Sequence, residues 1–133
     1  MLGNILTKLF GNKSDRDMKA LRPVVDKVNA AFENLGSLND NELRAKTLSF
    51  QDKIKEATQS EVEAIADLRG KLDQEEEVEV KERYYDEIDQ LETKLTEKIE
   101  TVLEDIKSEA FAVVKETARR WKENGELVVD ATD

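Results

Sequence analysis

Carboxylates are the most abundant groups in this sequence that could do chemistry. The 133 residues include 31 Asp and Glu and 21 Lys and Arg, but no His and no Cys. An acid–base pair or metal site would therefore lack histidine, the side chain that titrates nearest neutral pH and the commonest metal ligand. On long helices, moreover, Asp and Glu are mostly solvated surface residues. We therefore expect no catalytic residue, no cofactor-binding residue and no metal ligand in this chain.

The densest acidic stretch runs from Asp73 to Glu79. It lacks the alternating ligands and the central glycine of an EF-hand loop, so we interpret it as a polar connection and not as a calcium site. Neither the Gly-x-Gly-x-x-Gly pattern nor the Gly-x-x-x-x-Gly-Lys-Ser/Thr pattern occurs in the sequence. The chain therefore carries no recognisable loop for binding a nucleotide phosphate.

Charge is distributed unevenly along the chain. Residues 56–107 carry a net charge of -11, whereas residues 1–22 carry +3. The negative electrostatic field of residues 56–107 repels the phosphates of nucleic acids, so we expect no nucleic-acid partner. No apolar run approaches the ~20 residues that span a bilayer, and no secretory signal is recognisable. We expect a cytoplasmic location.

The amino terminus carries a short amphipathic stripe next to this basic excess. Its apolar residues recur with helical spacing, and basic residues follow at once. One interpretation is that the stripe packs on the chain's own helices or on a second copy. The other is an interfacial anchor, in which each basic residue near an anionic surface contributes ~1 kcal/mol. The predicted docking residues are Leu2, Ile5, Leu6, Lys8, Leu9, Phe10, Lys13 and Arg16.

The elements that would position these groups are all predicted to be helices. Gly and Pro are scarce, with five and one residues, which argues against many short strands. A helix is predicted over 14–36 with a kink at Pro23, because its apolar spacing continues across the proline. A second helix is predicted from about Glu42 to Leu72, after a capping box formed by Asn39 and Glu42.

A third long helix is predicted after the acidic stretch, and a final helix is predicted to begin at Ser108 as its N-cap. The final helix would carry an apolar stripe and end at Asn124-Gly125. Two long amphipathic helices joined by a short polar segment indicate an antiparallel hairpin. The predicted fold class is therefore all-α, with a long antiparallel coiled-coil-like hairpin. The stripe of the final helix consists of Phe111, Val114, Ala118 and Trp121.

Three blocks of sequence resemble the SecA family, the bacterial ATPases that drive preproteins through a membrane channel. The first is Leu6-Thr7-Lys8-Leu9-Phe10-Gly11, and the second is the Asp40-x-Glu42-Leu43-x-x-Lys46-Thr47 pattern followed by Phe50. The third, Glu109-Ala110-Phe111-Ala112-Val113-Val114-Lys115-Glu116, is similar to the family's Glu-Ala-Phe-Ala-Val-Val-Arg-Glu signature. Ser108 departs from the family's usual proline, and the resemblance covers about 1–53 and 107–122.

The resemblance implies an amino-terminal segment of an ATP-driven preprotein translocase. The implied partners are the SecYEG channel, an anionic phospholipid surface and, for the full-length protein, a preprotein. The full-length protein would use ATP and Mg and lie peripherally on the cytoplasmic face of the bacterial inner membrane. The segment itself would supply docking and scaffold helices, because its sequence ends before the family's phosphate loop.

The resemblance also suggests an organisation of the chain. Residues 1–12 would form an amphipathic amino-terminal helix, and 13–53 with 107–133 the helical lead-in of the first nucleotide-binding domain. Residues 54–106 would be an acidic helical-hairpin insertion. The alternative is a stand-alone helical-hairpin adaptor, which a stop codon directly after Asp133 would favour. A homodimer is compatible with either interpretation.

Overall fold

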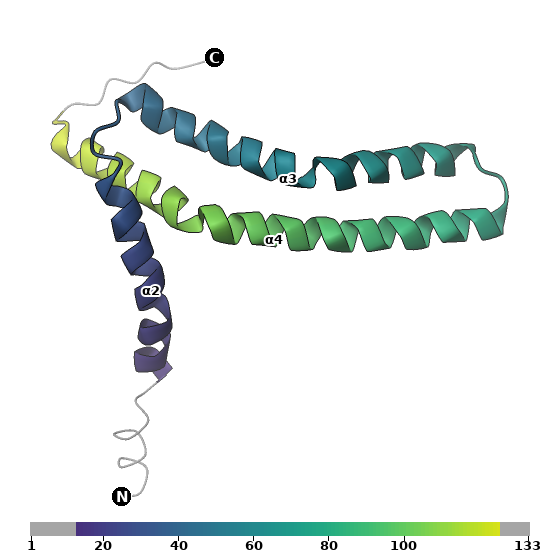
Figure 1. Cartoon of the computed structure of the whole chain (residues 1–133), viewed down its shortest axis with the longest axis horizontal. Helices are drawn as coiled ribbons and strands as arrows, with labels where there is room; N and C mark the ends of the chain where they lie inside the picture. The colour runs from purple at the N-terminus through teal and green to yellow at the C-terminus, as the bar shows by residue number, and fades with distance from the viewer. Residues whose placement is uncertain (1–12, 126–133) are drawn as a thin grey trace, which may run out of the picture. The chain divides into compact units, whose positions relative to one another are not determined.

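A computed structural model describes residues 13–125 of the chain. This part contains three helices, α2 (Lys13–Glu33), α3 (Asp40–Gln74) and α4 (Val78–Glu123), and no strand (Figure 1). The predicted all-α class is therefore confirmed for the described residues. The predicted amino-terminal helix lies outside them.

The first described helix, α2, continues without interruption across Pro23. The apolar spacing correctly predicts one helix here, whereas the kink at Pro23 stays a prediction. The helix ends at Glu33 and is followed by a turn over 34–37, which contains Gly36. Backbone N–H groups of Asn34 and Leu35 donate to the carbonyls of Ala31 and Phe32, which tightens the last turn.

The next helix, α3, begins with the predicted capping box. The Asn39 side-chain oxygen accepts a hydrogen bond from the Glu42 N–H at 3.0 Å, and Glu42 Oε2 accepts one from the Asn39 N–H at 2.8 Å. Two amide groups at the helix start thus receive side-chain partners. Leu38, which precedes the cap, packs against the cluster that contains Leu43, as expected of a hydrophobic staple.

The acidic stretch between the long helices forms a turn that is shorter than the sequence suggests. Only residues 75–77 are non-helical, because Asp73 extends α3 and Glu79 lies in the first turn of α4. Glu75 Oε1 accepts hydrogen bonds from the N–H groups of Glu76 and Glu77 at 2.9 and 3.0 Å. These bonds lower the pKa of the Glu75 carboxyl, so the side chain stabilises the turn as an anion.

The last helix, α4, is one continuous helix of 46 residues. The prediction of a separate final helix capped by Ser108 is therefore wrong. Residues 78–123 contain neither Gly nor Pro, and one serine inside a helix costs only a few tenths of a kcal/mol. With no helix breaker, the ladder of backbone hydrogen bonds runs through Ser108. The helix ends directly before Asn124-Gly125, as predicted.

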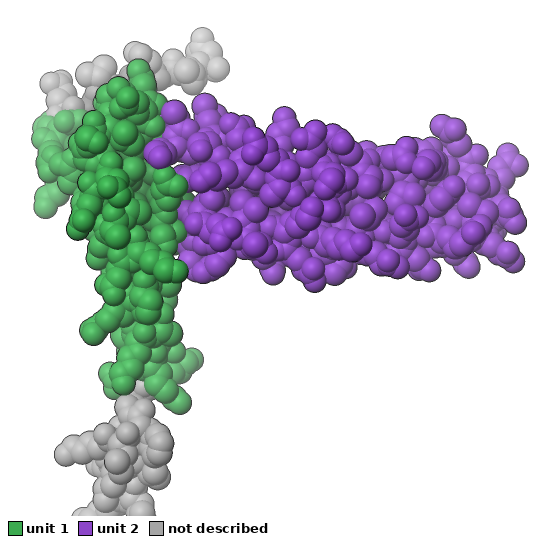
Figure 2. Space-filling view, viewed as in Figure 1, with its two compact units in different colours: residues 1–43, 108–133 green, residues 44–107 purple. Residues whose placement is uncertain are grey.

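The chain divides into two compact units, residues 1–43 with 108–133 (unit 1) and residues 44–107 (unit 2) (Figure 2). In unit 1 the buried residues Leu35, Leu43 and Ala112 form a small core, against which Val28 and Phe32 of α2 pack. The Lys115 ammonium lies 4.2 Å from the centre of the Phe32 ring and also donates a hydrogen bond to Asn29 Oδ1.

Unit 2 is an antiparallel helical hairpin. Its core comprises Ile65 and Leu68 of α3 and Ile88 of α4, with Tyr84, Leu91 and Leu95 packed against them. Ion pairs join Glu61 to Lys98 and Arg69 to Glu92. Residue numbers therefore rise along α3 while those of their partners on α4 fall, so the two helices run antiparallel. This register confirms the predicted hairpin. The assignment of residues 54–106 as an insertion stays a prediction.

Candidate functional site

A buried carboxylate that two arginines contact lies in unit 1, near the end of α4. Glu116 has no exposed surface, and its carboxylate accepts hydrogen bonds from two arginines. Arg119 donates through Nε and Nη2 at 2.9 and 2.7 Å, and Arg120 donates through Nε at 2.8 Å. Because the arginines follow Glu116 by three and four residues, the helix itself brings all three side chains to one face.

Arg120 connects this face of α4 to the segment between α2 and α3. Its Nη1 donates to Asp40 Oδ1 at 2.7 Å, and its Nη2 donates to the backbone carbonyls of Leu38 and Leu35 at 2.7 and 3.3 Å. Such carbonyls after a helix end have no helical partner of their own. The planar guanidinium supplies several donors at once, which a lysine ammonium in this position would not match geometrically.

The cluster holds Glu116 in its ionised form. Hydrogen bonds from Arg119, followed by those from Arg120, outweigh burial and lower the pKa of the Glu116 carboxyl to about 2. The same pairing raises the pKa of both arginines. A carboxylate so strongly stabilised is a poor proton acceptor at neutral pH, so the arrangement fixes the fold instead of transferring protons.

Sequence reasoning did not single out this cluster. Of its members, only Glu116 belongs to a predicted block, as the last residue of Glu109–Glu116, and no role was predicted for either arginine. The available signal was a glutamate followed at i+3 and i+4 by the pair Arg119-Arg120. That spacing is common on exposed helices, and the link from Arg120 to Asp40 spans 80 residues, which a local pattern does not reveal.

The predicted docking residues lie mostly outside the described part of the chain. This holds for Leu2, Ile5, Leu6, Lys8, Leu9 and Phe10. The structure places Lys13 and Arg16 in the first turns of α2, and both are exposed. Their docking role therefore stays a prediction.

Within residues 13–125 no three acidic side chains converge in a way that could hold a metal ion. None of the helices in the same range is long and apolar enough to cross a membrane.

The comparisons with known proteins agree on one family. The SecA DEAD-like domain family matches residues 6–129. The "Protein translocase subunit SecA" of Phocaeicola vulgatus is 45% identical over 126 residues, which cover 95% of this chain and 11% of that protein. The protein of the same name from Cytophaga hutchinsonii is 45% identical over 138 residues, which cover 99% of this chain and 12% of the relative.

These matches also bear on the length of the chain and on its hairpin. The chain spans only 11–12% of the length of these curated relatives. A match over 95–99% of the chain includes the hairpin, so the relatives from Phocaeicola vulgatus and Cytophaga hutchinsonii share that region. No solved structure matches the chain. The ordered sequence blocks, the all-helical fold and the match over residues 6–129 lead to one conclusion: the chain belongs to the SecA family.

Proposed function

We propose that this chain works as part of an ATP-driven preprotein translocase that acts with the SecYEG channel. In this proposal the segment contributes docking and scaffold surfaces, while ATP and Mg are bound by other parts of the protein. Family membership supports the proposal, as does the name of the relatives, protein translocase subunit SecA; these relatives are eight to nine times as long as this chain. The protein would then lie at the cytoplasmic face of the inner membrane.

The observation that carries the scaffold role is an uncovered apolar face on α4. Phe111, Val114 and Trp121 are 60, 67 and 62% exposed, although they recur with helical spacing. The opposite face of the same helix carries the fully buried Ala112 and Glu116. Three large apolar side chains on one exposed face are typical of a surface that packs against another part of a protein.

The occupant of this face would be the remainder of the SecA DEAD-like domain. The family match places α4 inside that domain, and the matched relatives continue far beyond the aligned region. Residues 13–53 and 107–133 would then be the helical lead-in of the first nucleotide-binding domain.

Single cysteines test the packing of α4, because the chain has none of its own. Val114→Cys should react quickly with a maleimide in the 133-residue chain and at least tenfold more slowly in a protein extended to the relatives' length. Thr101→Cys, on the exposed part of the hairpin, should react at similar rates in both. Equal rates at residue 114 in the two proteins would remove the scaffold proposal.

The docking role is assigned to residues 1–16. Their stripe of Leu, Ile and Phe would enter the acyl boundary, while Lys8, Lys13 and Arg16 meet anionic headgroups or the channel. The exposure of Lys13 and Arg16 on α2 is consistent with this role.

Vesicle flotation tests the docking role directly. Residues 1–133 should float with vesicles rich in anionic phospholipid, and residues 17–133 should not. A matched variant with Lys8, Lys13 and Arg16 all changed to Gln keeps the apolar stripe but should bind several-fold more weakly. Equal flotation of the two lengths, or equal binding to zwitterionic vesicles, contradicts the membrane anchor.

A further inference from the structure

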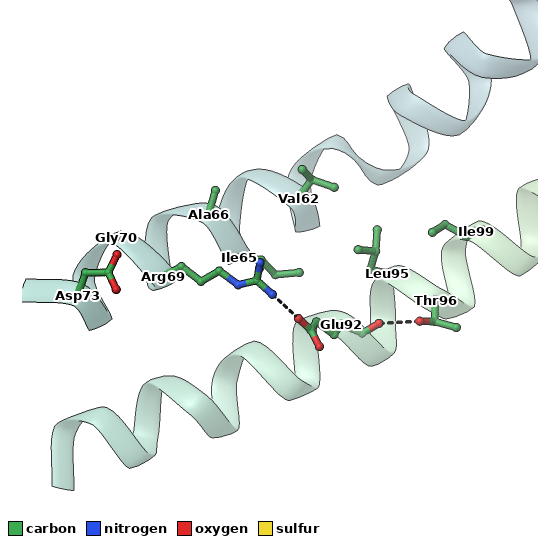
Figure 3. Close-up of a pocket in the computed structure, with 10 residues that line it drawn as sticks. All are labelled: Val62, Ile65, Ala66, Arg69, Gly70, Asp73, Glu92, Leu95, Thr96 and Ile99. Atoms are coloured by element: carbon green, nitrogen blue, oxygen red, sulfur yellow. Dashed lines mark hydrogen bonds and ion pairs between the residues drawn. The ribbon is translucent and has the colours of Figure 1, made fainter. Parts of the chain in front are cut away.

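An open apolar groove runs along the hairpin of unit 2 (Figure 3). It has a volume of about 800 Å³ and lies between α3 and α4. Figure 3 shows the aliphatic side chains of Ile65, Leu95 and Ile99 in the space between the helices. The groove is distinct from the charged cluster around Glu116, and the proposed function above does not use it.

Two of the residues that α3 contributes to the groove are small. Ala66 and Gly70, one helical turn apart, line the groove and are both exposed. A glycine inside a helix is less favourable than an alanine, so a reason for its presence is expected. A Cβ added to Gly70 would meet nothing within 4 Å, which means that no described part of the chain requires the glycine. Close approach of a backbone from outside would require it.

The negative charge around the groove favours a binding partner with positive charge. Arg69, Asp73 and Glu92 line the groove, with Arg69 paired to Glu92, and the surrounding residues 56–107 carry a net charge of -11. Several of the nearby bases are already engaged by acids of the hairpin. The ion pairs are Arg69–Glu92 at 2.8 Å, Lys71–Asp67 at 2.6 Å and Lys98–Glu61 at 2.7 Å.

A second copy of the hairpin would bring the same negative field against this surface, which opposes self-association. A helix whose narrow apolar ridge is flanked by lysine or arginine complements both the apolar floor and the acidic surroundings. We propose that the groove binds a basic amphipathic helix of a partner protein, packed closely over Ala66 and Gly70.

The test measures binding of a helical probe to the complete 133-residue chain. The probe is a fluorescein-labelled peptide of repeated Leu-Lys-Gln-Ala-Ala-Gln-Lys, which places Leu and Ala on one face with Lys on both flanks. The control peptide carries Glu in place of Lys. Fluorescence anisotropy should show saturable binding of the Lys peptide that weakens as salt is raised, and at least tenfold weaker binding of the Glu peptide.

Two substitutions locate the binding site. Ala66→Gln, which fills the groove, should weaken binding of the Lys peptide at least tenfold, whereas Ala45→Gln, on an exposed part of α3 outside the groove, should leave it unchanged. Gly70→Ala should also weaken binding while the melting temperature stays equal or rises, since alanine favours the helix. This combination separates loss of the surface from loss of the fold.

Three results would overturn the proposal. The first is no saturation by the Lys peptide at millimolar concentration. The second is equal affinity of the Ala66→Gln and Ala45→Gln variants. The third is a dimer in sedimentation experiments that Ala66→Gln abolishes, because the groove would then belong to a second copy of the chain.

Discussion

The two units hold their helices together in different ways. In unit 1 a small apolar core around Leu35 and Ala112 adjoins the buried carboxylate of Glu116, and Arg120 bonds to groups far away in the sequence. In the hairpin the helices meet along an apolar seam, which is crossed by the exposed pair Arg69–Glu92 and the partly buried pair Lys98–Glu61. Polar bonds to distant groups supplement the apolar core of unit 1, whereas a repeated apolar stripe holds the hairpin together.

The difference follows from what each unit must satisfy. In unit 1 the chain leaves one helix and enters the next, so the carbonyls of Leu35 and Leu38 lie outside any helical hydrogen-bond ladder. Arg120 donates to the Leu38 carbonyl and adds a second donor to the Leu35 carbonyl, which also accepts from the Leu38 N–H. In the hairpin most of the backbone is already paired within two long helices, so the contact between the helices rests mainly on apolar burial.

Core truncations should produce the largest effects and should act separately on the two units. Leu35→Ala should lower the free energy of unfolding of unit 1 by about 3 kcal/mol, and Ile88→Ala should lower that of the hairpin by a similar amount. Hydrogen exchange should speed up only in the altered unit. Leu21→Ala, at an exposed site, should change stability by less than about 0.5 kcal/mol.

Equal acceleration of exchange in both units by either core truncation would show that the chain unfolds as one cooperative body. The two units would then have no separate free energies of unfolding to compare.

Removal of the buried carboxylate should be the next largest effect. Glu116→Ala leaves Arg119 and Arg120 without their shared partner and should destabilise unit 1 by about 2 kcal/mol in urea unfolding. Glu123→Ala is the matched control, because Glu123 also pairs with Arg119 but is largely exposed. A loss equal to that of the control would mean that the cluster contributes no more than a surface ion pair.

Acid should act on unit 1 through the same carboxylate. The pKa of Glu116 is lowered to about 2 in the folded chain, whereas an unfolded glutamate titrates near 4.5. Its contribution is therefore present above about pH 4.5 and is lost as the pH falls toward 2. The stability difference between the wild type and Glu116→Gln should shrink over that interval. A difference that does not vary with pH would contradict the ionised state of Glu116.

The smallest effect is expected at the surface of the hairpin. Arg69 and Glu92 pair at 2.8 Å, but both side chains are about half exposed or more. A double-mutant cycle with Arg69→Ala and Glu92→Ala should give a coupling of less than about 0.5 kcal/mol that declines with salt. A coupling as large as that of the Glu116 cluster would mean that charged pairs stabilise the two units to the same extent.

Local sequence signals predicted what depends on neighbours along the chain. The capping box of Asn39 and Glu42 follows from residues three apart, and the hairpin follows from apolar spacing on two long segments. The continuity of α4 through Ser108 was missed, because a serine that could cap a helix is also tolerated inside one.

Contacts between distant residues escaped prediction. No local pattern distinguishes Arg120, which bonds to the Leu38 carbonyl, from the surface residue Lys122. Similarly, the stripe of Phe111, Val114 and Trp121 was identified from its spacing, but spacing does not say whether the chain itself covers it. The structure shows these three side chains exposed.

The bond from Arg120 to the Leu35 carbonyl has a consequence for the order of folding. It joins residues separated by 85 positions, and the intervening chain consists largely of the hairpin. Lys53 and Ile106 line one pocket, so a folded hairpin brings its two ends together. The loop left to close then has an effective length of about 30 residues, which lowers the entropic cost by about 1 kcal/mol. We therefore expect early formation of the hairpin to speed the assembly of unit 1, even though no buried residue of the hairpin belongs to the core of unit 1.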